Sequence, residues 1–294
     1  MTGSIQNEYL RVSAKTEDAE LVSGLSSDGA EYLWQGDPAY WADRSLTLFP
    51  YVARLFGGTY RMDGNEYSMN IHGLAPYTEF RLAKQTENEM TFEMTDTPET
   101  LKQYPRSFCF SVGYRLDGNT LHVTYEVKNT DFHVLYFGLG GHPGFNVPLE
   151  KGKAFSDYRL RFPFHSEPKR IGFSRDCFRD GTESPFPLEG GTVLPLSHSL
   201  FDDDAVVLKD VMREVTLESG GGKKSITVRY PDMPYLSIWH APKTDAPYVC
   251  IEPWCSLPSR QGEETAFEQR EDLIRVLPGD RYVNRWSMTF GCEA

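Results

Sequence analysis

Strict alternation of apolar and polar residues is the feature that most constrains how this chain folds. From Leu121 to Lys128, every second residue is apolar and each residue in between is polar or charged. Successive side chains of a β-strand point to opposite faces, so this pattern predicts a strand with one buried face. Residues 108–114 alternate in the same way, and Asp117-Gly118 lies between the two segments. An Asp-Gly pair suits the backbone of a tight turn, so the region predicts a β-hairpin.

The same alternation recurs at 90–94, 226–230 and 286–290, with turn residues between the segments. The 25 glycines and 19 prolines are spread along the chain, which favours many short strands over long helices. Residues 262–275 are the best helix candidate. The sequence therefore predicts an all-β fold of packed antiparallel sheets, in a single domain that covers residues 1–294.

The charge and the cysteines exclude several classes of protein. The net charge is −12, and lysine and arginine form no block; nucleic acids and anionic membranes attract basic patches, so neither is an expected partner. The five cysteines are scattered without a Cys-x-x-Cys pair: Cys109, Cys177, Cys250, Cys255 and Cys292. This spacing argues against a disulfide framework and against a zinc site, so we expect no bound metal.

The N-terminal residues give no sign of a targeting segment. The first twenty residues lack the basic and then apolar pattern of a signal peptide. No apolar run approaches the roughly 20 residues that a membrane-crossing helix needs. We therefore expect a protein of the reducing cytoplasm that has no membrane partner, and the number of its subunits stays open.

The first candidate for a functional side chain is His142, in the segment Gly-Leu-Gly-Gly-His-Pro-Gly-Phe-Asn at 138–146. Four glycines leave the backbone around the imidazole bare, so that a ligand can approach closely. Pro143 disfavours helical geometry at His142 and keeps it extended. An imidazole placed in this way can exchange a proton with a small substrate. The alternative is a histidine in a tight structural turn, and these residues alone favour neither interpretation.

The second candidate is Glu252, near the end of the apolar segment 246–254. Alternation places Val249 and Ile251 on one face of a predicted strand and Cys250 and Glu252 on the other. A carboxylate on a buried strand is costly to desolvate unless it is paired or used, so a functional role is slightly favoured. A salt bridge to an arginine, or a strand end in water, is the alternative.

Further polar residues lie beside apolar segments. The guanidinium of Arg54 is suited to bind two neighbouring oxygens at once. His72 precedes a glycine and follows an apparent strand; like Arg54, it would more often be structural. Asp202, Asp203 and Asp204 precede an apolar segment and would usually form a solvated turn, but one of them could turn inward and bind sugar hydroxyls.

Aromatic residues offer a possible sugar-stacking surface. Trp41, Trp239 and Trp254 could each stack on the apolar face of a pyranose ring, although a position in the core is the more common one. His240 lies near the predicted strand of Glu252, and we assign no role to it. The remaining histidines are expected on the surface or in loops: His122, His133, His165 and His198.

Five segments resemble, in this order, the aldose 1-epimerase (galactose mutarotase) family and especially its branch of LacX-type proteins. They are LFPYVARL at 48–55, YSMNIHGLAP at 67–76, GGHPGFNVPL at 140–149, YLSIWHAP at 235–242 and YVCIEPWCSLPS at 248–259. The resemblance extends from about residue 20 to about residue 290. It implies a large antiparallel β-supersandwich, with a sugar site in a cleft on one sheet. It also implies an enzyme without a cofactor that interconverts the α and β anomers of a hexose.

The resemblance assigns a role to each candidate residue. His142 matches the general acid of the family and Glu252 matches its general base, which predicts a protonated imidazole and an ionised carboxylate. Arg54 and His72 match the substrate-binding arginine and the first histidine, and the spacing favours Asp204 as the substrate-binding aspartate. This hypothesis requires the imidazole and the carboxylate to face each other across a pocket wide enough for one pyranose.

Three other functions compete with this one. A hexose 6-phosphate mutarotase would need a basic cluster at its rim, for which the candidates are Arg44, Arg54, Lys243 and Arg260. A non-catalytic carbohydrate-binding or sugar-sensing protein would keep the aromatic residues but would not need the His–Glu pair. A metal-dependent cupin isomerase would need a His-x-His pair, which this sequence lacks. The family resemblance leaves the identity of the hexose open, because Tyr51–Ala53 replace the Asn-Gly that precedes the arginine in better-known members.

Overall fold

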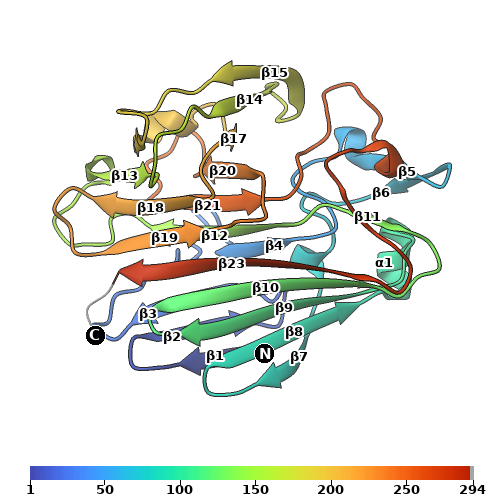
Figure 1. The fold of residues 1–294 in the computed structure, drawn as a ribbon, viewed down its shortest axis with the longest axis horizontal. Helices are drawn as coiled ribbons and strands as arrows, with labels where there is room; N and C mark the ends of the chain where they lie inside the picture. The colour runs from blue at the N-terminus through green and yellow to red at the C-terminus, as the bar shows by residue number, and fades with distance from the viewer. Residues whose placement is uncertain (292–294) are drawn as a thin grey trace.

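Two large antiparallel sheets, of nine and seven strands, dominate the computed structural model, which describes residues 1–291 (Figure 1). The nine-stranded sheet has the order β16 (Val193–Pro195), β13 (Tyr158–Arg161), β18 (Glu214–Ser219), β19 (Ser225–Arg229), β23 (Arg281–Gly291), β10 (Thr120–Asn129), β9 (Phe108–Asp117), β8 (Glu89–Thr95) and β7 (Arg81–Gln85). The seven-stranded sheet has the order β15 (Arg179–Pro185), β14 (Lys169–Phe173), β17 (Val206–Lys209), β20 (Tyr235–Trp239), β21 (Tyr248–Trp254), β12 (Gly140–Asn146) and β4 (Ser45–Leu48). The all-β supersandwich expected from the sequence is confirmed.

Smaller sheets and short helices complete the fold. Three strands form one small sheet, β1 (Thr2–Gln6), β2 (Leu10–Lys15) and β3 (Leu21–Ser26), and two pairs stand apart, β5 (Thr59–Met62) with β6 (Asn65–Ser68) and β11 (Leu135–Phe137) with β22 (Ile274–Val276). The helical elements are α1 (Pro98–Gln103) and the 3₁₀ turns η1 (Phe56–Gly58), η2 (Ala75–Tyr77), η3 (Phe155–Asp157), η4 (His198–Phe201) and η5 (Phe267–Gln269). In the described residues, no helix is long and apolar enough to cross a membrane.

The hairpin predicted from alternation is formed by β9 and β10. Asp117 pairs with Thr120, so Gly118 and Asn119 form the two-residue turn, and Gly118 has a φ of 55°. The apolar residues of both strands are buried, while the residues that alternate with them are largely half-buried or exposed. The period-two pattern therefore predicted the centre of the larger sheet correctly.

The helix prediction for residues 262–275 is wrong. That segment contains the 3₁₀ turn η5 and the first residues of β22, because Phe267 is buried against Tyr51 and Tyr60 and so fixes an irregular path. The α-helix of the described residues is α1, six residues long, which the alternation did not reveal. Its start has a recognisable signature: Thr97 caps the helix and Pro98 follows at the first position.

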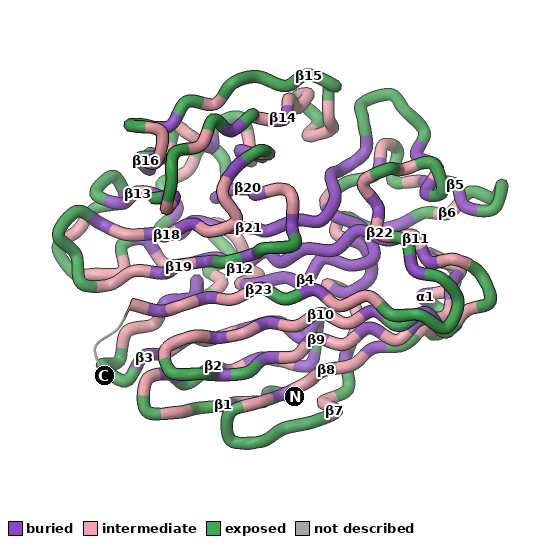
Figure 2. The backbone as a smooth tube through the Cα atoms, viewed as in Figure 1, coloured by how far each residue is buried: buried purple, intermediate pink, exposed green. Residues whose placement is uncertain are grey.

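The seven-stranded sheet separates the core from a second, functional face. Figure 2 shows β21 and β12 in purple, as buried strands, whereas β15 at the edge of the sheet is green. On β21, Val249 and Ile251 belong to the main hydrophobic core, whereas Cys250 packs into a separate cluster with Trp34 and Tyr248. Alternation therefore directs Glu252, which is two residues from Cys250, to the face away from the core.

A glycine beside the functional face allows two backbone segments to meet. Gly73 has a φ of 86°, and a Cβ there would lie 2.4 Å from the carbonyl oxygen of Phe49. We expect Gly73→Ala to lower the free energy of unfolding by more than the roughly 1–3 kcal/mol of backbone strain alone, because the clash adds to it. Gly29→Ala is the matched control, since its φ is 83° but no atom lies within 4 Å of the added Cβ. Chemical denaturation measures both, and equal losses would contradict the close approach.

Candidate functional site

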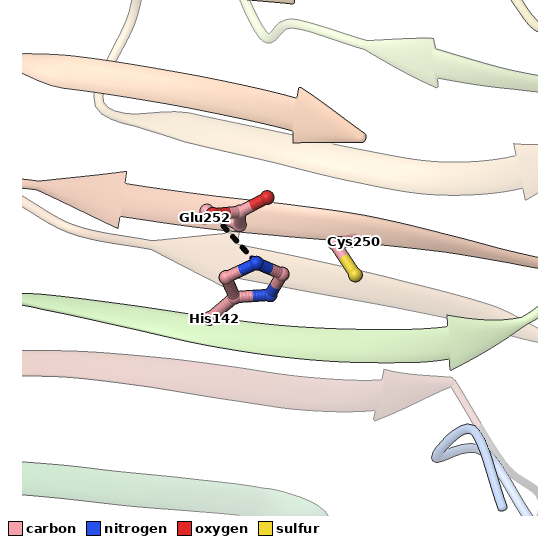
Figure 3. A group of neighbouring side chains, drawn as sticks. All are labelled: His142, Cys250 and Glu252. Atoms are coloured by element: carbon pink, nitrogen blue, oxygen red, sulfur yellow. Dashed lines mark ion pairs between the residues drawn. The ribbon is translucent and has the colours of Figure 1, made fainter. Parts of the chain in front are cut away.

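The register of two neighbouring strands brings His142 and Glu252 together. Gly140 of β12 pairs with Trp254 of β21, and Gly144 pairs with Cys250, so the antiparallel register places His142 opposite Glu252. Directly opposed residues of antiparallel strands have adjacent side chains. The Nε2 atom of His142 lies 3.4 Å from the Oε2 atom of Glu252, and Figure 3 shows the imidazole and the carboxylate on the same side of the sheet.

This arrangement corrects one detail of the expected geometry. At 3.4 Å, the two groups are too close for a pyranose ring to lie between them, so they do not face each other across the pocket. They lie side by side on one wall of it, because they come from adjacent strands of one sheet. Side-by-side groups can both reach two oxygens that are bonded to the same carbon.

Both groups are buried but incompletely hydrogen-bonded. His142 is 7% exposed and Glu252 is 1% exposed. Within residues 1–291, Nδ1 of His142 and Oε2 of Glu252 have no hydrogen-bond partner. A buried polar atom without a partner is costly, and its persistence in a fold commonly marks a site that a ligand completes.

Burial shifts both pKa values toward the uncharged forms. The ring of Trp41 lies 4.8 Å from the imidazole of His142, and the loss of water lowers the pKa of His142 to about 4. Burial, followed by the negative charge of Asp204, raises the pKa of Glu252 well above its usual value. Burial therefore favours a neutral imidazole and a protonated carboxyl, whereas the reaction expected from the sequence starts from the charged pair.

The raised pKa makes a prediction about stability. The unfolded chain ionises Glu252 near pH 4.5 and the folded protein does so at higher pH, so wild-type stability falls as the pH rises through this interval. A glutamine does not ionise, so its burial has no cost that grows with pH. We expect Glu252→Gln to gain stability relative to wild type as the pH rises from about 5 to 8. Thermal unfolding of both proteins at several pH values measures the difference; a constant difference would contradict the raised pKa.

A pocket of about 280 Å³ opens beside the pair. Ligand pockets span about 300–1,000 Å³, so this one is at the small end and suits a single sugar ring. All five residues singled out in the sequence line it: Arg54, His72, His142, Asp204 and Glu252. The fold therefore brings together segments that are far apart in the chain.

His72 lies in a turn beyond β6 and not at the end of a strand. Its φ is 64°, and its Nδ1 accepts a hydrogen bond of 3.2 Å from the backbone N–H of Ala53. This bond fixes the proton of the neutral ring on Nε2, which can then donate to a ligand. Burial lowers the pKa of His72 well below its usual value, so the ring remains a neutral donor at pH 7.

Arg54 and Asp204 lie at the mouth of the pocket with different degrees of exposure. The side chain of Arg54 is exposed, so the guanidinium is free to meet a ligand at the rim. Asp204 is half-buried, and its Oδ1 accepts a hydrogen bond of 2.7 Å from the indole N–H of Trp239. Asp203 also lines the pocket but is exposed, whereas Asp202 is not among the lining residues.

The preference for a core position was wrong for two of the tryptophans. Trp41 and Trp239 are half-buried, line the pocket, and meet at 86° with their ring centres 5.7 Å apart. Trp254 is buried and also lines the pocket. Perpendicular indoles form a corner against which the apolar face of a small ring can pack.

Two lining residues had no signal in the sequence. Ser237 pairs with Glu252 across β20 and β21, and its hydroxyl lies close enough to favour the ionised carboxylate. Cys177 has a φ of 63°, and its thiol hydrogen-bonds to Asp204; burial, and then this carboxylate, raises the pKa of the thiol to about 11. Neither residue follows a motif, so only the fold reveals them. Cys109, Cys177, Cys250 and Cys255 are free, and Cys292 lies outside the described residues.

Comparisons with known proteins identify the family of the chain. A family model described as aldose 1-epimerase matches residues 2–289. The chain belongs to the aldose 1-epimerase family. The chromosomal protein LacX of Lactococcus lactis subsp. lactis is 33% identical over 302 aligned residues, which cover 98% of this chain and 99% of that protein.

Solved structures of similar proteins extend the comparison. The galactose mutarotase related enzyme from Lactobacillus acidophilus is 32% identical to this family member, with a TM-score of 0.93, and the match covers 99% of this chain and 98% of that one. A galactose mutarotase-like protein from Lactobacillus casei ATCC 334 is 31% identical with a TM-score of 0.93, and here the match covers 99% and 100%. The structural similarity therefore extends over nearly the whole chain.

Proposed function

We propose that this member of the aldose 1-epimerase family is a mutarotase that interconverts the α and β anomers of an unphosphorylated hexose. The observation that supports the proposal most strongly is the His142–Glu252 pair. Both groups are buried, lie 3.4 Å apart, and line a pocket of hexose size. Two adjacent proton-exchanging groups, each with one buried polar atom that lacks a hydrogen-bond partner in the described chain, suit a reaction at two oxygens of a single carbon.

The reaction requires two coupled proton transfers. Glu252, as the ionised base, removes the proton from the anomeric hydroxyl O1, while protonated His142 donates its proton to the ring oxygen O5. The bond between C1 and O5 breaks, and C1 becomes an aldehyde. Rotation about the C1–C2 bond exposes the other face, and both protons return on closure. General acid and base groups each contribute about 10²- to 10⁴-fold to such steps.

The number of protons on the pair is the same at each stage of this cycle. A neutral imidazole with a protonated carboxyl holds as many protons as an imidazolium with a carboxylate, so the two states differ only in where one proton lies. Ring opening converts the charged pair into the neutral pair, and closure reverses the change. Burial favours the neutral pair in the empty pocket, so the bound sugar has to stabilise the charged state through its hydroxyls.

Electrostatics favours a free sugar over a sugar phosphate. Of the four basic residues that could have formed a phosphate site, Arg54 alone lines the pocket in the described part of the chain. The guanidinium of Arg44 donates to the carbonyl of Val22 and Arg260 pairs with Glu263. Four acidic residues line the same pocket: Asp43, Asp203, Asp204 and the proposed base Glu252. A doubly charged phosphate would meet repulsion there.

Asp204 is expected to bind the sugar without taking part in proton transfer. Its carboxylate accepts a hydrogen bond of 2.7 Å from Trp239 and lines the pocket. We expect Asp204→Ala to raise the KM by roughly 10- to 100-fold, which corresponds to the loss of one hydrogen bond to a charged group. The change in kcat should be smaller. Asp202→Ala is the matched control, because that side chain does not line the pocket. Steady-state polarimetry measures both, and similar KM values in the two variants would contradict the assignment.

A non-catalytic sugar sensor is the alternative from another class. It could use Arg54, Asp204 and the tryptophans in the same way, but it would gain nothing from a buried acid–base pair that destabilises the fold. We favour catalysis because the pKa of Glu252 is raised by burial, which is a cost that a pure binding site can avoid. Binding of a hexose without any acceleration of anomer exchange would favour the sensor.

A substrate panel tests the proposal. Polarimetry follows the approach to equilibrium of freshly dissolved α-glucose and α-galactose, and NMR exchange spectroscopy follows glucose 6-phosphate and galactose 6-phosphate. We expect acceleration in proportion to the protein concentration for a free hexose and little for its phosphate. Acceleration of the phosphates alone, or of no sugar, would overturn the proposal.

A further inference from the structure

A third side chain beside the catalytic pair gives this site a donor set that suits a metal ion. Cys250 lies on β21 two residues before Glu252, so its thiol projects from the same face of the strand. The three residues each offer one donor atom, and these atoms lie within 4.8 Å of one another. Figure 3 shows the three side chains as neighbours on two adjacent strands. All three residues are buried.

We propose that His142, Cys250 and Glu252 form an inhibitory site for a thiophilic divalent cation of the Zn²⁺ class. Zinc binds imidazole nitrogen, thiolate sulfur and carboxylate oxygen in this combination, at about 2.0–2.3 Å. Ligand atoms of a tetrahedral zinc therefore lie roughly 3.3–3.6 Å from one another. The 3.4 Å between Nε2 of His142 and Oε2 of Glu252 already meets this spacing. The donor atoms of all three residues lie within 4.8 Å of one another, so the group has to contract by roughly 1 Å around the ion.

An unpartnered carboxylate oxygen is a second, independent indication of a ligand. Oε2 of Glu252 is buried and has no hydrogen-bond partner within the described chain. A cation bound to the carboxylate would satisfy Oε2 and would hold the imidazole on the adjacent strand in place. His142 and Glu252 also line the pocket, so the pocket supplies the fourth coordination position, to water or to a sugar hydroxyl.

Charge balance favours a divalent ion. The Cys250 thiol and the Glu252 carboxyl are both buried, and each loses one proton when it binds a metal as thiolate or carboxylate. A bound Zn²⁺ displaces both protons and cancels both charges, which leaves a neutral site in a poorly hydrated environment. The residue pattern did not indicate a metal site, because a lone Cys-x-Glu and a distant histidine match no metal-binding spacing.

The consequence of occupancy is inhibition, and this part of the inference rests on the proposed function. The metal takes the lone pairs with which His142 and Glu252 exchange protons, so neither group can serve O1 or O5. Cys250 is not needed for the reaction itself. Its sulfur would therefore make the enzyme sensitive to zinc without contributing to turnover.

Titration of the chelator-treated wild-type protein with Co²⁺ tests binding without any activity assay. Thiolate ligation of Co²⁺ gives a sulfur-to-metal absorption band in the near ultraviolet. We expect this band at one equivalent of Co²⁺, its displacement by Zn²⁺, and its loss in both Cys250→Ser and Cys250→Ala. Cys109→Ser is the matched control and should keep the band. A wild-type spectrum without a thiolate band would overturn the site.

The activity measurement then separates this inference from the proposed function. We expect Cys250→Ser to keep the wild-type rate of anomer exchange. Half inhibition of this variant should need a Zn²⁺ concentration at least roughly 10- to 100-fold higher than that of the wild type, because even the loss of a residue outside the ligand shell lowers metal affinity by this factor. Equal sensitivity to Zn²⁺ in the two proteins would contradict a role for Cys250. If the protein proves to have no mutarotase activity, the Co²⁺ spectrum still decides whether the metal site exists.

Discussion

Glu252→Gln is expected to lower kcat for anomer exchange by about 10²- to 10⁴-fold, the contribution of one positioned proton-transfer group. The amide has nearly the shape of the carboxyl group but cannot accept the proton of O1. The KM should change little, because the pocket keeps Arg54, His72 and Asp204. Polarimetry with a freshly dissolved α-hexose measures the rate, after subtraction of the spontaneous reaction.

The control for this variant is Glu167→Gln, at a side chain that is 91% exposed. It carries the same chemical change on the surface and should keep the wild-type rate. Circular dichroism should show the same β-sheet spectrum for all three proteins. A Glu252→Gln protein that is folded and retains wild-type kcat would remove the carboxylate from the mechanism.

His142→Ala alone is expected to lower kcat by about 10²- to 10⁴-fold as well. The methyl group cannot donate a proton to O5, and the lost ring leaves a space between Trp41 and Glu252 in which a small molecule can bind. We therefore expect added imidazole to restore part of the activity. Rates with and without imidazole, measured near pH 7, test both statements.

His165→Ala provides the matched control, because the side chain of His165 is 69% exposed. That variant should have the wild-type rate and should not respond to imidazole. Full activity of His142→Ala would show that another group protonates O5. In the double variant with Glu252→Gln, the losses should not add, because the two groups act in one coupled step.

Much of the fold could be predicted because alternation reports burial directly. In β9 and β10 the apolar residues all face the core, so the period of two is complete and the hairpin was evident. Alternation was less informative for β12 and β21, where almost every residue is buried. A strand that is covered on both faces has no polar side to mark its period.

The helix predictions failed for a different reason. The segment 262–275 contains polar residues of good helix propensity, but Phe267 is fixed in the core between Tyr51 and Tyr60. This tertiary contact overrides local propensity. The helix α1 is too short for its apolar residues to form a periodic pattern, so only its N-terminal cap was available as a signal.

The candidate site was predicted in its residues but not in its geometry. The family resemblance singled out five side chains, and the fold brings all of them to one pocket. It did not indicate that His142 and Glu252 are cross-strand neighbours, because that depends on the register of β12 and β21. The protonation of the pair depends on burial by Trp41 and Trp239, which come from other parts of the chain.

In the proposed reaction, His142 and Glu252 act together on the anomeric carbon of one hexose. A crystal structure of the Glu252→Gln variant soaked in free glucose or galactose tests it most directly. We expect one sugar in the pocket, with O1 and O5 each within about 3.2 Å of the side chain at 252 or of Nε2 of His142. A sugar that turns C1 away from both side chains, or that binds only outside this pocket, would contradict the claim.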